Sequence, residues 1–150
     1  MFETERKFLV SQPIEHLVEK KVDIVQGYLF AEHESHEFRI RISADKAKIT
    51  IKEKHAAITR SELEFNITVD FASHFLSLID SNEIIKKQRY YINHNGKEWS
   101  IDDFEDPKLN FLLAEVELEC CTEELDLPEW VGDEVTGDSK YYNYNLRKVK

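Results

Sequence analysis

Acidic and basic residues recur at every second position in several segments of this sequence, with apolar residues between them. In an extended chain Glu3, Glu5 and Lys7 share one face, while Phe2 and Phe8 share the other. Carboxylates placed in this way supply the hard oxygen ligands that hold Mg²⁺ or Mn²⁺. Arginine and lysine donate to phosphate oxygens, so cations with the same spacing suit a compact polyanion. The carboxylates are Glu3, Glu5, Asp102, Glu115 and Glu117, and the cations are Lys7, Arg39, Arg41, Lys52, Lys87 and Arg89.

The elements that must position these side chains are predicted to be β-strands. Alternation with a period of two residues marks eight segments, at about residues 2–10, 22–30, 36–43, 47–54, 60–67, 83–92, 97–104 and 112–120. Asn95-Gly96 joins the sixth and seventh segments and predicts a hairpin, because a type I′ turn needs a positive φ at both central positions. The chain is therefore predicted to be mainly β.

Three short stretches are predicted to be helical. The first follows Ser11-Gln12-Pro13 and carries Ile14, Leu17 and Val18, the second is capped by Asp70 and extends to Ile79, and the third runs from Asp138-Ser139 to Leu146. The first two have one apolar face, which predicts that they pack against the strands.

Two interpretations of the charged strand faces remain open. For a single antiparallel strand, a solvated polar face is the expected arrangement. For the strands together, faces crowded with both signs of charge favour a closed eight-stranded barrel whose interior holds one small ligand. Because a buried unpaired ion is costly, opposite charges and bound ions must compensate one another inside such a barrel.

Composition excludes several classes of function. With 20 Lys and Arg against 30 Asp and Glu, the net charge is −10, which disfavours binding to nucleic acid or to an anionic membrane. No apolar stretch approaches the roughly 20 residues that span a bilayer. Adjacent Cys120 and Cys121 suit neither a disulfide with each other nor a zinc site, and predict reduced thiols in the cytoplasm. No linker divides the chain, so residues 1–150 are predicted to form one domain.

The order of the charged residues along the chain resembles that of a known family. Glu3-Thr4-Glu5-Arg6-Lys7 has the form E-x-E-x-K at the N-terminus, as in the CYTH superfamily, or triphosphate tunnel metalloenzymes. The resemblance covers nearly the whole chain. It continues through Gln26-Gly27-Tyr28-Leu29, Arg39-x-Arg41, Lys52, Arg60-x-Glu62-x-Glu64, Lys87-x-Arg89, Asp102, Glu115-x-Glu117 and residues 132–138.

This resemblance implies a role for each group of residues. The residues implied to bind one or two Mg²⁺ or Mn²⁺ ions are Glu3, Glu5, Asp102, Glu115 and Glu117. Those implied to bind the substrate are Lys7, Arg39, Arg41, Lys52, Arg60, Lys87, Arg89 and Lys140. Glu62 and Glu64 are implied to orient the cations or a water molecule. In some members, residues at the places of Tyr28 and Lys52 are a pair that helps to activate water, and Lys87 and Arg89 are candidates for stabilising the transferred or leaving phosphate. Lys140-Tyr141 departs from relatives, which often have arginine before the tyrosine.

The resemblance implies an eight-stranded tunnel that binds triphosphate with a divalent cation and hydrolyses it. The chain carries no long insertion for holding a base, which favours inorganic tripolyphosphate as substrate. A class IV adenylate cyclase, a thiamine triphosphatase and a polyphosphate-binding module without turnover remain alternatives. The absence of a glycine-rich phosphate loop disfavours a P-loop enzyme. The sequence leaves open whether the protein is a monomer or a homodimer.

Overall fold

A computed structural model describes residues 2–30, 35–54 and 58–147 of the chain. Nine strands dominate this part of the protein. They are β1 (Phe2–Val10), β2 (Lys20–Leu29), β3 (His36–Ser43), β4 (Lys46–Glu53), β5 (Thr59–Ile67), β6 (Ile84–His94), β7 (Lys97–Phe104), β8 (Leu112–Glu117) and β9 (Val131–Glu134).

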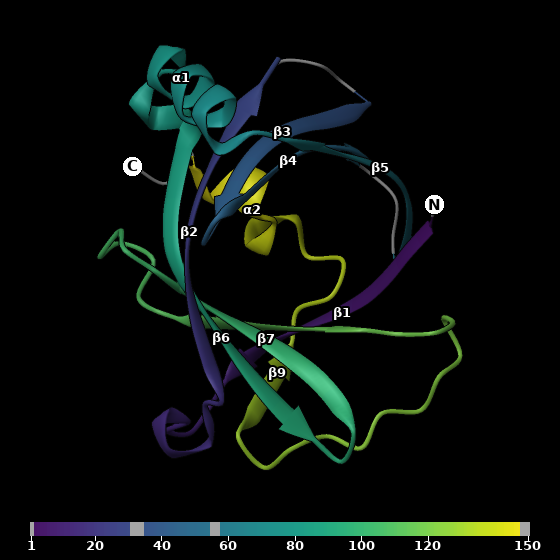
Figure 1. The fold of residues 1–150 in the computed structure, drawn as a ribbon. Helices are drawn as coiled ribbons and strands as arrows, with labels where there is room; N and C mark the ends of the chain where they lie inside the picture. Colours follow the sequence, from purple (N-terminus) through teal and green to yellow (C-terminus); the bar gives the residue numbers. More distant parts are fainter. Residues whose placement is uncertain (1, 31–34, 55–57, 148–150) are drawn as a thin grey trace.

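The strands form an antiparallel sheet that closes on itself. Their order is β5-β4-β3-β2-β6-β7-β8-β1-β9, and β1 also pairs with β5. One stretch of β1 makes this closure, with Phe2 opposite Ser61 and Thr4 opposite Thr59, while residues 5–9 pair with β8. The first eight strands are thereby a closed barrel (Figure 1). The predicted fold class is confirmed.

The strand register places the charged side chains on the inside. Lys7 lies opposite Glu115, and Arg89 lies opposite Asp102. Directly opposed residues of neighbouring strands project to the same side of a sheet. The alternation along each strand therefore gathers the charged side chains in the lumen, and the intervening apolar residues lie on the outer face. The Asn95-Gly96 hairpin is confirmed, with φ of 51° and 82° at its two residues.

Strand β9 was not predicted from the sequence. It has only four residues, Val131–Glu134, and no alternating apolar pattern. It pairs with the second half of β1, and Gly132 permits a close approach, since a Cβ there would lie 3.1 Å from the Leu9 carbonyl oxygen. Arg6 adds a bidentate hydrogen bond to Glu134, with distances of 2.8 and 2.7 Å.

The predicted first helix is wrong. The chain forms only the 3₁₀ turn η1 (Glu15–Leu17), because Val18 is already extended with φ −70° and ψ 120°. Ile14 is buried and Leu17 is 38% exposed, so these two residues do not share one apolar face.

Helix α1 (Val69–Leu78) confirms the second predicted helix, but its cap differs from the prediction. Thr68, and not Asp70, accepts the hydrogen bond from the backbone N–H of Phe71, at 3.1 Å. Asp70 lies in the first turn, where a carboxylate is favoured by the positive end of the helix dipole. The helix packs with Ala72 and Leu76 on Ile40 and Ala47 of the outer sheet face. The 3₁₀ turn η2 (Ser81–Glu83) then leads into β6.

The predicted third helix is broken in two. Asp138 accepts from the backbone N–H of Lys140 as expected, but the turn that it begins, η3 (Ser139–Tyr141), is 3₁₀. Tyr142 is extended, and a single α-helical turn follows, α2 (Asn143–Leu146). Figure 1 shows α2 in yellow within the ring of strands.

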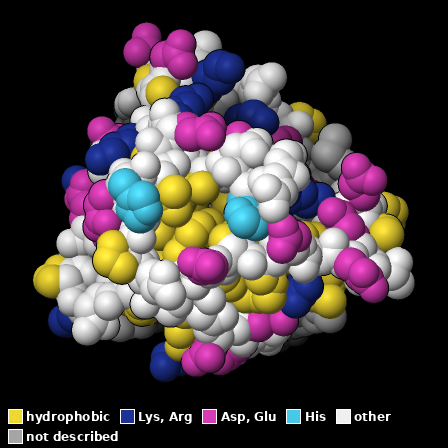
Figure 2. Space-filling view, turned by 90° about the horizontal axis from the view of Figure 1, so that it is seen from below, with side chains coloured by type: hydrophobic (Ala, Val, Ile, Leu, Met, Phe, Trp, Pro, Cys, Tyr) yellow, Lys and Arg dark blue, Asp and Glu magenta, His cyan; other side chains and the backbone are white. Residues whose placement is uncertain are grey.

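Apolar residues close one end of the lumen. Phe104 lies opposite Lys87 and Leu113 opposite Asp102, so both share the inward face with charged residues. They cluster with Val135 and Leu146 from the C-terminal segment. A separate cluster, which includes Trp99 and Trp130, packs on the outer face. Apolar side chains also gather in the middle of the lower face of the molecule, with acidic and histidine side chains around them (Figure 2).

Candidate active site

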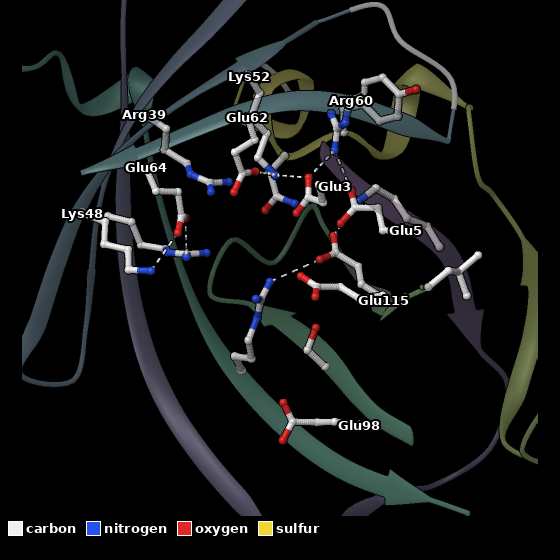
Figure 3. Close-up of a pocket in the computed structure, with 18 of the residues that line it drawn as sticks. Glu3, Glu5, Arg39, Lys48, Lys52, Arg60, Glu62, Glu64, Glu98 and Glu115 are labelled. Atoms are coloured by element: carbon white, nitrogen blue, oxygen red, sulfur yellow. Dashed lines mark hydrogen bonds and ion pairs between the residues drawn. The ribbon is translucent and has the colours of Figure 1, made fainter. Parts of the chain in front are cut away.

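The barrel encloses a charged cavity of about 650 Å³. Most of the residues predicted for the site line it (Figure 3). They are Glu3, Glu5, Lys7, Arg39, Arg41, Lys52, Arg60, Glu62, Glu64, Lys87, Arg89, Glu115 and Glu117.

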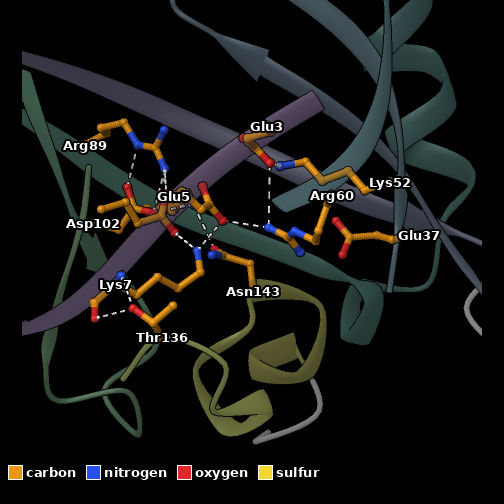
Figure 4. A network of polar contacts seen from close by, with 12 residues as sticks. Glu3, Glu5, Lys7, Glu37, Lys52, Arg60, Arg89, Asp102, Thr136 and Asn143 are labelled. Atoms are coloured by element: carbon orange, nitrogen blue, oxygen red, sulfur yellow. Dashed lines mark hydrogen bonds and ion pairs between the residues drawn. The ribbon is translucent and has the colours of Figure 1, made fainter. Parts of the chain in front are cut away.

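Strand β1 presents two carboxylates to this cavity, of which Glu3 is half-buried and Glu5 is buried. Glu3 Oε2 accepts from Lys52 Nζ at 2.7 Å, and Glu5 Oε1 accepts from Arg60 Nη2 at 2.6 Å (Figure 4). Burial, and the negative charge of Glu5, raise the pKa of Glu3. Burial acts in the same direction on Glu5, but the positive charges of Lys7, Lys52 and Arg60 together outweigh it, so the pKa of Glu5 is lowered.

Lys7 joins β1 to β8 through ion pairs with two carboxylates. Its Nζ lies 2.9 Å from Glu5 Oε1 and 2.5 Å from Glu115 Oε1. These pairs outweigh the effect of burial and raise the pKa of Lys7, which keeps the ammonium charged. Burial opposes ionisation of Glu115, but Lys7 and Arg89 bring its pKa well below the ordinary value.

Asp102 is fully buried beneath the cavity surface, where it holds two cations of β6. Arg89 Nε donates to Oδ1 at 2.6 Å and Nη2 to Oδ2 at 2.8 Å, while Lys87 Nζ donates to Oδ2 at 2.6 Å. Burial lowers the pKa of Lys87 to about 7, since the nearby charge of Arg89 partly cancels the attraction of Asp102. The charges of Arg89 and Lys87 lower the pKa of Asp102 against the effect of burial.

Two guanidinium groups at the cavity, those of Arg39 and Arg41, lack full compensation by close partners. The carboxylate paired with Arg41 is Glu64, at 3.9 Å, and burial together with the charges of Arg39 and Arg89 lowers the pKa of Arg41 to about 10. Arg39 Nε is buried without a hydrogen-bond partner within the described part of the chain. A bound anion would satisfy both groups, since arginine matches phosphate oxygens through paired N–H donors.

Three predicted residues do not line the cavity. Tyr28 is buried, receives a hydrogen bond from Gln26 Nε2 at 2.6 Å, and has a pKa raised by burial. Lys52, with which the resemblance pairs Tyr28, does line the cavity and pairs with Glu3 and with Glu62, at 2.7 and 2.9 Å. Asp102 is fully buried behind its two cations, as described above. Lys140 is exposed, with Nζ 5.3 Å from the centre of the Tyr141 ring.

The cavity lining also includes residues that sequence reasoning did not assign to the site, among them Glu37, Tyr142 and Asn143. Glu37 lies two positions before Arg39 on β3, so the period of two could have identified it. Tyr142 and Asn143 carry no such signal, because their place depends on how the C-terminal segment enters the barrel. Arg60 lies 5.7 Å from the Tyr142 ring centre, and Lys87 Nζ donates to Asn143 Oδ1 at 2.8 Å.

The donor set fits a hard divalent cation. Glu3, Glu5, Glu115 and Glu117 bring carboxylate oxygens to the cavity from the neighbouring strands β1 and β8. Among the described residues no three acidic, histidine or cysteine side chains converge closely enough to hold a metal ion. Because Lys7 and Lys52 pair with Glu5, Glu115 and Glu3, a cation competes with these ammonium groups for the same oxygens.

Comparison with known proteins agrees with this geometry. The chain is 35% identical to an inorganic triphosphatase of Acetivibrio thermocellus, over 97% of this chain and 93% of that protein. It is 33% identical to one of Nitrosomonas europaea, over 97% of both chains. A crystal structure of an inorganic triphosphatase superposes with a TM-score of 0.71 at 28% identity, covering 97% of this chain and 94% of that one. Residues 1–149 match the CYTH domain. The protein therefore belongs to the CYTH domain family.

Proposed function

We propose that this protein is a hydrolase that converts inorganic tripolyphosphate to pyrophosphate and orthophosphate in the barrel lumen. The observation that carries the proposal is the set of cations around the cavity, in which Arg41 lacks a close counter-ion and Arg39 Nε lacks a partner among the described groups. A short phosphate chain supplies the missing negative charge. The two relatives that bear the name inorganic triphosphatase support the same substrate.

A divalent cation fits beside these cations. We infer that Glu3, Glu5, Glu115 and Glu117 hold Mg²⁺ or Mn²⁺, in one or two ions, and that Asp102 acts from behind Lys87 and Arg89. When bound, the metal neutralises phosphate charge and lowers the pKa of a coordinated water.

The side chains of the cavity bind and orient the substrate and compensate its negative charge. Arg39 and Arg41 bind phosphate oxygens, while Asp102 holds Arg89 and Lys87 where they offset charge on the transferred group. Glu64 accepts from Lys48 at 2.7 Å and orders the cations at the cavity edge. Phosphoryl transfer needs in-line placement and charge neutralisation more than covalent chemistry, which suits a site of this kind.

A substrate panel tests the proposal. Tripolyphosphate, ATP and thiamine triphosphate are each incubated with Mg²⁺ or Mn²⁺, and the products are separated by chromatography. We expect orthophosphate from tripolyphosphate to be released fastest, because cyclisation of ATP also requires the ribose 3′ hydroxyl to be held in line with the α-phosphate. Cyclic AMP and pyrophosphate as the main products, with tripolyphosphate untouched, would make the protein an adenylate cyclase. Binding without turnover of any of the three would make it a binding module.

We infer a cytoplasmic location from the two thiols, since Cys120 and Cys121 are both free and exposed. Within the described residues, no helix has the length and apolar character needed to cross a membrane.

A further inference from the structure

The ammonium group of Lys87 is held from two sides at the closed end of the lumen. It donates to Asp102 Oδ2 at 2.6 Å and to Asn143 Oδ1 at 2.8 Å. An ammonium group carries three N–H donors and no acceptor. Two donors are thus committed to the protein, and the third is left for the cavity that Lys87 lines.

We propose that Asn143 is a positioning residue, which orients Lys87 so that its third donor faces the triphosphate. The inference rests on the proposed function for its substrate. Asp102 alone would leave the ammonium free to rotate about a single anchoring hydrogen bond. A second acceptor removes that freedom, and pre-organised donors are the main source of transition-state stabilisation in such sites.

The chemistry of the amide suits this role. The group that faces an ammonium must accept a hydrogen bond, which assigns Oδ1 of Asn143 to Lys87. A neutral acceptor orients the cation without cancelling its charge. Asp102 and Glu115 already place negative charge near Lys87. A further carboxylate at this position would repel a phosphate chain, whereas an amide does not.

Asn143 is itself fixed by the residues that follow it. The helix α2 has only four residues, Asn143–Leu146, and so short a helix has little stability of its own. Arg147 is fully buried, donates from Nη1 to the Tyr144 carbonyl at 2.8 Å and forms an ion pair with Glu83. Its guanidinium lies 3.9 Å from the Tyr144 ring centre, and that ring packs edge-on against Tyr28. This anchor at the end of α2 holds Asn143 in the lumen.

A double-mutant cycle tests whether Asn143 acts through Lys87. Asn143→Ala and Lys87→Ala are compared singly and together, with Asn145→Ala as the matched control in the same helix. The Asn145 side chain donates to the Ser139 carbonyl at 2.8 Å. We expect Asn143→Ala to lower kcat for tripolyphosphate by about tenfold with a smaller change in KM, since a hydrogen bond to a charged group is lost. In the Lys87→Ala background the same change should alter kcat less than about twofold.

A calorimetric titration of tripolyphosphate without metal supplies a readout that does not depend on turnover. Asn143→Ala should weaken binding by about threefold in the native background and have no effect in the Lys87→Ala background. Equal losses in both backgrounds, in rate or in affinity, would overturn the proposal, because Asn143 would then act only on the fold. If Asn143→Ala unfolds, Asn143→Ser takes its place, since serine is polar but too short to reach Lys87. A native protein that binds tripolyphosphate without hydrolysing it would refute the proposed function, and the calorimetric cycle would still decide the role of Asn143.

Discussion

Glu5 and Glu117 lie directly opposite each other in the β1–β8 ladder. Glu5 is buried and pairs with Arg60 and Lys7, whereas Glu117 makes no ion pair within the described part of the chain. Like charges directly opposed on neighbouring strands destabilise a sheet by about 0.2–1 kcal/mol. A divalent cation bound by both carboxylates would convert this repulsion into attraction.

Replacing Glu117 by Gln should therefore separate stability from metal binding. Without metal, Glu117→Gln should raise the free energy of unfolding by up to about 1 kcal/mol, because the repulsion with Glu5 is removed. The same change should weaken Mn²⁺ binding by about tenfold and abolish metal-dependent phosphate release. Urea denaturation, calorimetry and a phosphate assay measure the three effects. Glu129→Gln is the control, since Glu129 is exposed outside the cavity. Full activity of Glu117→Gln at limiting Mg²⁺ would contradict the metal assignment.

Arg41 is expected to destabilise the ligand-free protein and to strengthen the binding of tripolyphosphate. Its charge is disfavoured by burial and by Arg39 and Arg89, so Arg41→Met should stabilise the ligand-free protein by on the order of 1 kcal/mol. The variant should bind tripolyphosphate about tenfold more weakly, because a bidentate phosphate donor is lost. Thermal unfolding with and without tripolyphosphate measures both effects.

Lys21→Ala is the control for this comparison. Lys21 is exposed at the start of β2, where its Nζ lies 5.4 Å from the Tyr90 ring centre. If Arg41→Met and Lys21→Ala change the affinity equally, the cavity does not select the anion, and the lumen interpretation fails.

Substitutions of Arg147 and Glu83 should have non-additive effects on the free energy of unfolding. Arg147→Met removes a buried cation and should lower the free energy of unfolding by about 3–5 kcal/mol, as is typical when one partner of a buried pair is removed. Glu83→Gln should also destabilise the protein, since it leaves the fully buried guanidinium without its counter-ion. In denaturant unfolding, the double variant should lose less unfolding free energy than the sum of the losses in the two single variants. Strict additivity would show that the pair does not anchor the C-terminal segment.

Stability should depend on pH through the contact between β1 and β9. The hydrogen bonds from Arg6 lower the pKa of Glu134 below its ordinary value of 4.5. A carboxyl group whose pKa is lowered on folding contributes stability above its unfolded pKa, and this contribution is lost as the pH falls through the folded value. Because Glu134 is 39% exposed, we expect at most about 1 kcal/mol. The difference in unfolding free energy between the native protein and Glu134→Gln should be present at pH 7 and should disappear as the pH falls through the lowered pKa of Glu134. A constant difference over this range would mean that the carboxylate charge is irrelevant.

The strands and their faces could be predicted because they are local properties. Alternation in segments such as Glu3-Thr4-Glu5-Arg6-Lys7 determines which side chains share a face, whatever the neighbouring strand is. The same alternation would have identified Glu37. The helices were harder to predict, since apolar spacing at Ile14 and Leu17 does not distinguish a helix from a turn whose residues pack separately.

The sequence by itself determined the family resemblance, the eight strands of the barrel wall and the set of charged residues that face one side of each strand. Only the tertiary structure decided that this side is the inside, because closure depends on three pairs between β1 and β5, from Phe2 opposite Ser61 to Thr4 opposite Thr59. It also decided that Asp102 is covered by Lys87 and Arg89 and that Asn143 reaches Lys87, 56 positions earlier in the chain. Contacts of that kind leave no periodic trace in a sequence, because they depend on where a distant segment enters the barrel and not on the conformation of its own residues.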